Sequence, residues 1–135
     1  MKIIIETPKY SFWKYNKTEK GYEKAFFSPL PIIFNYGFVE GTESADGMEE
    51  DVVVLGPCLP RGSTLKRKAF DGTVKFLDDS IRDDKKIIYI SGFRSPVLLA
   101  LYFRLYALFK VFLYAFREGK IATCRFEGIE FLELH

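Results

Sequence analysis

Residues 35–55 have the sequence NYGFVEGTESADGMEEDVVVL, which is the most informative segment of this chain. An aromatic segment enters a loop that carries Gly37, Gly41 and Gly47, and the β-branched run that follows is too short for anything but a strand. Six carboxylates fall between Glu40 and Asp51. Because crowded carboxylates repel one another, a loop that holds several of them together predicts a bound cation. The alternative is a solvated acidic loop between two strands.

The composition is that of one globular domain covering residues 1–135, with 48% hydrophobic and 28% charged residues. A net charge of only +2 argues against a dedicated nucleic-acid binder. Cys58 and Cys124 are too few for a disulfide framework, which leaves free thiols or a single bridge. The only histidine is His135, so a metal would sit on carboxylate oxygens, which favours Mg²⁺, Mn²⁺ or Ca²⁺ over Zn²⁺. The first apolar run is too short for a signal peptide, so we expect a cytoplasmic protein.

Short extended segments separated by glycine and proline predict a mainly β fold, a small closed barrel. The expected strands cover residues 2–7, 11–16, 22–28, 32–39, 51–55 and 86–91. Residues 63–70 and 73–77 are expected to form a hairpin around the turn dipeptide Asp71-Gly72. After a helix, residues 121–134 are expected to add one or two short strands around Gly128.

A long apolar helix is predicted near the C-terminal end. Ser95 and Pro96 suit the N-cap and first helical positions, and only Arg104 and Lys110 are charged in residues 97–116. A helix that is apolar nearly all round is buried, at an interface or in a membrane. The length suits a span of about 20 residues, but each basic residue at mid-span costs ~2.5–3.5 kcal/mol. We therefore expect this helix to pack on the outside of the barrel and to form a homo-oligomer interface, with a membrane-surface role as the minority alternative.

The order Asn35-Tyr36-Gly37-Phe38, then Asp46-Gly47, then Asp51-Val52, resembles the signature of the soluble (family I) inorganic pyrophosphatases. The resemblance extends from Glu6 to about Gly128 and implies an OB-like five-stranded closed barrel with helices outside. It also implies that family members are oligomers. In that family the tyrosine reaches phosphate, and three following aspartates bind Mg²⁺ and activate water.

The resemblance assigns roles to residues in the first half of the chain. Glu6, within Ile5-Glu6-Thr7-Pro8, matches a glutamate that supports the metal site through contacts with the residues around it. Lys14 matches a phosphate-binding lysine, and Tyr36 matches the phosphate-contacting tyrosine. Asp46 and Asp51 match two metal ligands. Taken alone, an exposed glutamate, a surface lysine and a core aromatic are the ordinary interpretations of Glu6, Lys14 and Tyr36.

A second acidic loop matches the family as well. The family places an aspartate, another aspartate five residues later, and a lysine two residues further on, and Asp78, Asp83 and Lys85 have that spacing. Two loops with two matched aspartates each would bring four acids to one mouth of the barrel. Such a set of hard oxygen ligands suits Mg²⁺, with Mn²⁺ as an alternative.

Several positions depart from the family pattern. An expected glutamate is Asn16, and an arginine that grips phosphate falls on Lys24, which keeps the charge but loses the bidentate fork. A second tyrosine falls on Ile32, and a C-terminal Tyr-Lys pair falls on Tyr114-Ala115. The general base of the family falls on Met48, whose thioether neither binds Mg²⁺ nor takes a proton.

Two functions follow from these residues. The first is an inorganic diphosphatase-like hydrolase, dependent on Mg²⁺ and acting on pyrophosphate or a related phosphoanhydride. Lys14, Tyr36 and Lys85 would act in catalysis, and Glu49 or Glu50 would replace the missing base. Phosphate-binding side chains would be, beside those three, Lys24 and Tyr114. The alternative is a non-catalytic phosphate-binding, metal-binding or assembly protein on the same scaffold.

Overall fold

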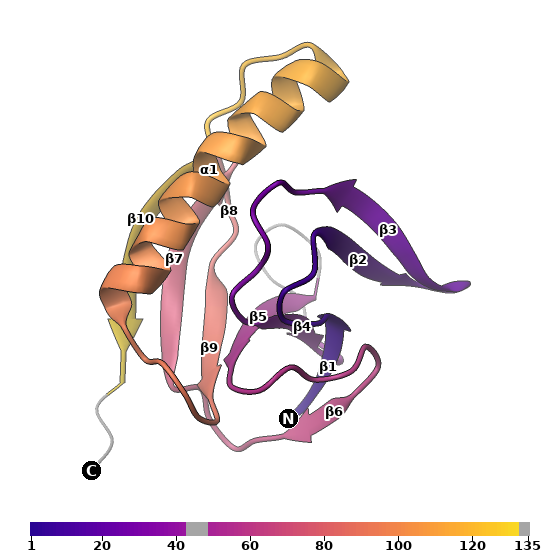
Figure 1. Ribbon diagram of the computed structural model, residues 1–135, viewed down its shortest axis with the longest axis vertical. Helices are drawn as coiled ribbons and strands as arrows, with labels where there is room; N and C mark the ends of the chain where they lie inside the picture. The colour runs from indigo at the N-terminus through magenta and orange to yellow at the C-terminus, as the bar shows by residue number, and fades with distance from the viewer. Residues whose placement is uncertain (43–48, 133–135) are drawn as a thin grey trace.

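The structure is a computed structural model that describes residues 1–42 and 49–132 (Figure 1). Within them the chain is mainly β with one long helix towards the C-terminal end, as the sequence predicts. The strands are β1 (Lys2–Thr7), β2 (Trp13–Thr18), β3 (Gly21–Phe27), β4 (Asn35–Val39), β5 (Glu50–Leu55), β6 (Thr64–Lys66), β7 (Gly72–Asp78), β8 (Ile81–Arg82), β9 (Lys85–Tyr89) and β10 (Arg125–Phe131). The helix is α1 (Pro96–Glu118).

Eight of these strands form one sheet in the order β10-β7-β9-β5-β4-β1-β6, with β8 paired to β7. The pair β5–β9 is parallel and the other pairs are antiparallel. The strands β2 and β3 form a separate hairpin. Among the described strands the ladder runs from β10 to β6 without a pairing between these two ends, so the closed five-stranded barrel stays a prediction.

The prediction of a hairpin around Asp71-Gly72 is wrong. Strand β6 pairs with β1, whereas β7 pairs with β8, β9 and β10. The backbone amide of Asp71 donates to the Ile87 carbonyl, and a Cβ added at Gly72 would overlap the Glu130 carbonyl. The dipeptide therefore lies where three backbones come close together. Ladder pairing with distant strands outweighs the local preference of Asp-Gly for a turn.

The β-branched run of β5 is buried on both faces because the sheet has a core on each side. Alternate residues of a strand point to opposite faces, and Val53 and Leu55 pack into a cluster with helix residues. Val52 and Val54 pack into a second cluster with Ile3 and other aliphatic side chains of β1, β4 and β9. Burial on both sides explains why this segment shows no polar alternation.

Helix α1 begins at the residue that its sequence predicts. The Ser95 hydroxyl accepts a hydrogen bond from the Leu98 amide at 3.2 Å, and Gly119 closes the helix in the left-handed conformation. The buried face carries Leu99, Tyr102 and Phe103 and packs against the sheet, along β7 and β10 (Figure 1). Among the described residues, α1 is the one helix that is long and apolar enough to cross a bilayer. This is weak evidence for a membrane span, because the core helices of soluble proteins can have the same length and composition.

Candidate functional site

A buried lysine joins two of the predicted aspartates. In the parallel β5–β9 ladder Val52 lies opposite Lys86, so Asp51 and Lys85 are neighbours. Asp83 precedes Lys85 by two residues. The Lys85 Nζ lies 2.9 Å from Asp83 Oδ2 and 3.4 Å from Asp51 Oδ2, and the lysine is 1% exposed. Asp51 and Asp83, one from each of the two acidic segments, therefore lie on either side of one ammonium group.

The ion pair decides the charge state of this group. Burial lowers the pKa of Lys85, but the carboxylates of Asp51 and Asp83 outweigh it and the pKa is raised. Burial also opposes ionisation of Asp83, yet the Lys85 ammonium lowers the pKa of this carboxyl below its usual value. For Asp51, which lies farther from the ammonium, burial dominates and raises the pKa. The site thus holds a fixed positive charge beside an ionised Asp83.

Tyr36 and Lys14 adjoin this group. Tyr36 comes from β4, opposite Val53 of β5, and the Lys14 and Lys85 ammonium groups lie 4.8 and 5.5 Å from the centre of its ring. Its buried hydroxyl has no hydrogen-bond partner in the described part of the chain. Burial and the charge of Asp51 raise its pKa well above the usual value, so the hydroxyl stays a proton donor. Unpaired buried polar atoms are rare in folded proteins, and each one calls for an explanation such as a functional role or a bound water or ion.

Glu6 anchors the hairpin that carries Lys14. Its carboxylate accepts a hydrogen bond from the Lys17 amide at 2.7 Å, and the Thr7 hydroxyl accepts one from the Tyr15 amide at 3.0 Å. These two bonds attach β2 to the end of β1. Glu6 is 8% exposed, and burial raises its pKa. Its support of a metal site stays a prediction.

Asp78 lies in a second polar group at the end of β7. Its Oδ1 accepts a hydrogen bond from the Tyr114 hydroxyl at 2.8 Å, and its Oδ2 lies 3.4 Å from the Lys110 ammonium. Tyr114 and Lys110 project from the C-terminal half of α1. The sequence predicts both Asp78 and Tyr114 for the site, and the structure joins them directly.

A cleft of about 410 Å³ lies between the β2–β3 hairpin and α1. Cationic side chains line both of its walls. The lining residues are Lys14, Asn16, Ala25, Phe26, Lys110, Leu113, Tyr114, Arg117 and Glu118. A cleft of this size and charge is suited to a small anion.

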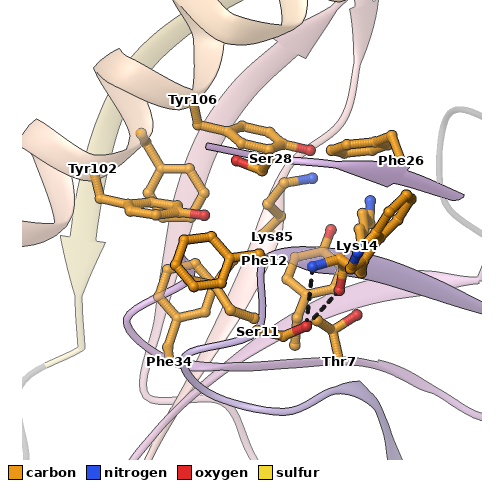
Figure 2. A pocket seen from close by; sticks show the side chains of 14 residues that line it. Thr7, Ser11, Phe12, Lys14, Phe26, Ser28, Phe34, Lys85, Tyr102 and Tyr106 are labelled. Carbon is orange, nitrogen blue, oxygen red and sulfur yellow. Dashed lines mark hydrogen bonds between the residues drawn. The ribbon is translucent and has the colours of Figure 1, made fainter. Parts of the chain in front are cut away.

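A second cavity, of about 30 Å³, lies deeper, under α1. Figure 2 shows Tyr102 and Tyr106 projecting from α1 over it, with Lys85 beneath them. Phe34 and Ile32 also line it. This volume holds about one water molecule, so the cavity belongs to the aromatic core and gives Lys85 an apolar surrounding.

The structure does not bring every predicted residue together. The exposed Lys24 lies over the Trp13 ring, 4.7 Å from its centre, and does not line the cleft. Glu50 faces Lys86, with 3.7 Å between Oε1 and Nζ. The carboxylate of Glu49 accepts a hydrogen bond from the Gly41 amide, and its charge contributes to the raised pKa of Glu6. Asp46 and Met48 lie outside the described residues.

Carboxylate oxygens of the predicted set fit a hard divalent cation in their chemistry. Asp51 and Asp83 meet at Lys85, whereas Asp78 is held by Tyr114 and Lys110. Across residues 1–42 and 49–132, no three side chains of aspartate, glutamate, cysteine or histidine form a group with metal-ligand spacing. Cys58 and Cys124 are both free thiols.

Sequence reasoning missed two residues of α1, Tyr106 and Lys110. Tyr106 lines the deeper cavity together with Lys85, and its ring centre lies 5.7 Å from that of Phe76. Burial raises its pKa. The signal was the spacing of residues 106, 110 and 114. Positions four apart share one face of a helix, so Tyr114 could have pointed to both.

Together the fold and site define a mainly β protein with aspartates, lysines and a tyrosine gathered beside one long helix. The model of one protein family, described as inorganic pyrophosphatase, matches residues 3–97. The chain belongs to the inorganic pyrophosphatase family. The match ends as α1 begins, so the roles of Lys110 and Tyr114 rest on the geometry alone.

Two curated relatives agree with this assignment. The inorganic pyrophosphatase of Gluconobacter oxydans is 32% identical over 90 residues, which cover 63% of this chain and 51% of that protein. The inorganic pyrophosphatase of Corynebacterium efficiens is 29% identical over 89 residues, covering 63% and 56%. The match thus spans about half the length of these relatives.

Solved structures have the same fold over nearly the whole chain. The inorganic pyrophosphatase of Thermus thermophilus superposes with a TM-score of 0.78 at 19% identity, covering 97% of this chain and 82% of that one. The Helicobacter pylori inorganic pyrophosphatase gives a TM-score of 0.76 at 20% identity, covering 97% and 84%. At these identities the likeness concerns the fold, and it includes α1.

Proposed function

We propose that this chain is a hydrolase that cleaves inorganic pyrophosphate, with the help of a divalent cation. The observation that carries the proposal is the Lys85 ammonium fixed between Asp51 and Asp83, with the Tyr36 hydroxyl and Lys14 beside it. Family membership supports the same activity. Aspartates for a cation, lysines for phosphate oxygens and a neutral hydroxyl donor are what phosphoanhydride hydrolysis requires.

The proposed cation is Mg²⁺, with Mn²⁺ as an alternative, and its ligands would be Asp46, Asp51, Asp78 and Asp83. When bound, it supplies Lewis acidity at the phosphate oxygens. Lys85 would keep Asp83 and Asp51 close together before the cation arrives, because its charge offsets the repulsion between them. Mg²⁺ should therefore raise the melting temperature of the wild type. Asp46→Asn or Asp83→Asn should abolish that shift, and a wild type that Mg²⁺ does not stabilise would exclude the site.

The chain's own residues would act on the substrate as follows. Lys14 and Lys85 attract phosphate oxygens, and Tyr36 donates a hydrogen bond to one of them. A water oxygen bonds to one phosphorus while the bridging oxygen leaves with the other phosphate and takes up a proton. A base must accept the proton of the attacking water, and Met48 has no group for it. We propose Glu49 as this base, because the Glu50 carboxylate faces Lys86, whereas the Glu49 carboxylate lies at the Gly41 amide, 3.3 Å away.

Phosphate release from pyrophosphate in the presence of Mg²⁺, by the wild type and by Met48→Asp, tests the activity. A general base contributes typically 10²–10⁴-fold in rate. Release by the wild type would support a replaced base. A silent wild type and an active Met48→Asp would mean that the site is intact apart from its base. Silence of both would favour the alternative, a binding or assembly protein on this scaffold.

We propose further that α1 joins two copies of the chain. Its outer face exposes Leu98, Leu101, Leu105, Leu108 and Phe112, each at least 41% accessible. Their spacing alternates between three and four residues, which is the pattern of helices that pair along a seam. A groove of about 310 Å³ formed with Pro29 and Leu30 adjoins this row. A second copy of α1 would cover both, and a membrane surface is the competing occupant.

A cytoplasmic location completes the proposal. The described cysteines are both free, and Cys58 is exposed, which suits a reducing compartment. No nucleic-acid partner is proposed, because the net charge of the chain is only +2.

A further inference from the structure

We propose that Lys110 is a phosphate-binding cation of this site, presented on the face of α1 that also carries Tyr114. The inference deepens the proposed function, because it concerns how the same site holds a diphosphate. It rests on the placement of Lys110 in the cleft between α1 and the β2–β3 hairpin.

Lys110 and Tyr114 contact the same carboxylate from one face of the helix. They are four residues apart, and both reach Asp78: Tyr114 through its hydroxyl at 2.8 Å, and Lys110 through its ammonium at 3.4 Å. Ala115 is turned by ~100° from Tyr114 around the helix, is exposed and does not line the cleft. The position that carries a cation beside Tyr114 in this chain is therefore residue 110.

The Lys110 charge faces a second cation across the cleft. The ammonium groups of Lys110 and Lys14 lie 5.1 and 5.6 Å from the centre of the Phe26 ring. Arg117 lines the same cleft and donates to the Ala25 carbonyl at 3.1 Å, so its guanidinium is held near the hairpin. Three cations against the carboxylates of Asp78 and Glu118 leave a positive excess in a space of about 410 Å³. A compact polyanion such as a diphosphate matches that charge.

A purely structural role explains Lys110 less well. The side chain of Lys110 is only 12% exposed, in a helix that is otherwise almost wholly apolar. A leucine or methionine would fill the same space beside Phe26 without the desolvation of an ammonium group. Asp78 already has the Tyr114 hydroxyl as its hydrogen-bond donor. A charge retained at that cost points to a ligand of opposite sign.

Calorimetric titration of the full chain with imidodiphosphate, an analogue of pyrophosphate that resists hydrolysis, tests this in the presence of Mg²⁺. A hydrogen bond to a charged group contributes enough that Lys110→Met should weaken binding about 10- to 100-fold. Lys110→Arg, which keeps the charge, should restore most of it. Lys120→Met is the matched control, because Lys120 pairs with Asp79 at 2.6 Å and does not line the cleft.

The outcomes separate the two proposals. Wild-type affinity in Lys110→Met, with the melting temperature unchanged, would overturn the role of Lys110. If Lys110→Met does not fold, Lys110→Gln is measured in its place and the same affinity criterion applies. Tight binding by a wild type that releases no phosphate would refute hydrolysis but support Lys110, provided that Lys110→Met loses the binding. A wild type that binds no imidodiphosphate would overturn both.

Discussion

The Lys85 ammonium lies 2.9 Å from the Asp83 carboxylate, at a place where the lysine is 1% exposed and the aspartate side chain 15% exposed. Asp51 shares the same ammonium at 3.4 Å. The pair connects the end of β5 with the segment between β8 and β9, so one buried charge holds both acidic segments in register. Burying an ammonium group costs desolvation free energy, and removing it alone is also destabilising because it leaves its buried partners with uncompensated charges.

Lys85→Met should destabilise the protein by about 3 kcal/mol at neutral pH, because it leaves two partly buried carboxylates unpaired. The pKa of Asp83 is lowered in the folded state, so the pair contributes stability above its usual value of 3.8, and that contribution is lost as the pH falls through the folded-state pKa. The deficit of the variant should therefore shrink below about pH 4. Urea unfolding at several pH values measures both effects.

Lys75→Met provides the control for this experiment. Lys75 also lies 2.8 Å from a carboxylate, that of Glu130, but both side chains are exposed. Its loss should change the unfolding midpoint little. Equal destabilisation by the two variants, or none by Lys85→Met, would contradict the importance of the buried pair.

Glu6→Gln should stabilise the protein at neutral pH. Burial raises the folded-state pKa of Glu6 above its usual value of 4.5, so the stability linked to the protonated form is present below 4.5 and is lost as the pH rises through the raised pKa. Glutamine keeps an oxygen for the Lys17 amide and carries no charge. The melting temperatures of variant and wild type should converge below about pH 4.5 and diverge above it. A variant that is less stable than the wild type at pH 7 would contradict this.

The local signals in the sequence predict several elements well. The β-branched segment before Pro8 gives β1 over Lys2–Thr7, and Ser95-Pro96 marks the start of α1. The i, i+2 spacing of Asp83 and Lys85 also holds, because such residues lie on one side of an extended chain. In each case the interactions that determine the local structure act between residues close together in the sequence.

The remaining features depend on distant partners. Asp71-Gly72 looks like a turn, but Gly72 pairs with Ile87 and Phe131, which are 15 and 59 residues away, and no local preference reveals that. Lys110 looks like an interruption in an apolar helix until β7 brings Asp78 to it. Likewise, the sequence leaves Glu49 and Glu50 equivalent, and the fold separates them by pairing Glu50 with Lys86.

Glu49→Gln and Glu50→Gln should differ in activity for that reason. If Glu49 accepts the proton of the attacking water, its loss should lower kcat for pyrophosphate by about 10²–10⁴-fold. Glu50→Gln removes only the ion pair with Lys86 and should therefore leave kcat near the wild-type value. Steady-state phosphate release measures both. A normal rate in Glu49→Gln would remove Glu49 from the mechanism.

Gly37→Ala should destabilise the sheet although it adds only one methyl group. A Cβ at Gly37 would overlap the backbone carbonyl of Ile4 on the neighbouring strand β1. The strands must separate to admit it, at a cost of about 1–3 kcal/mol. Thr64→Ala, on the exposed edge strand β6, is the control and should cost much less. Urea midpoints of the two variants give the comparison, and an unchanged midpoint for Gly37→Ala would contradict the close approach.

Leu105→Glu combined with Leu108→Glu should convert an oligomer into monomers. Both leucines are exposed, at 44% and 56%, and lie in the middle of the outer row of α1. Two charges would face the second copy of the helix, where burying them costs far more than the leucines contribute. Because the opposite face of α1 makes the contacts with the sheet, the circular dichroism spectrum should not change. Ile121→Glu, at a residue 95% exposed and beyond the helix, is the control. Light scattering measures the masses: a monomeric wild type would exclude the interface, and its binding to lipid vesicles would assign the row to a membrane surface instead.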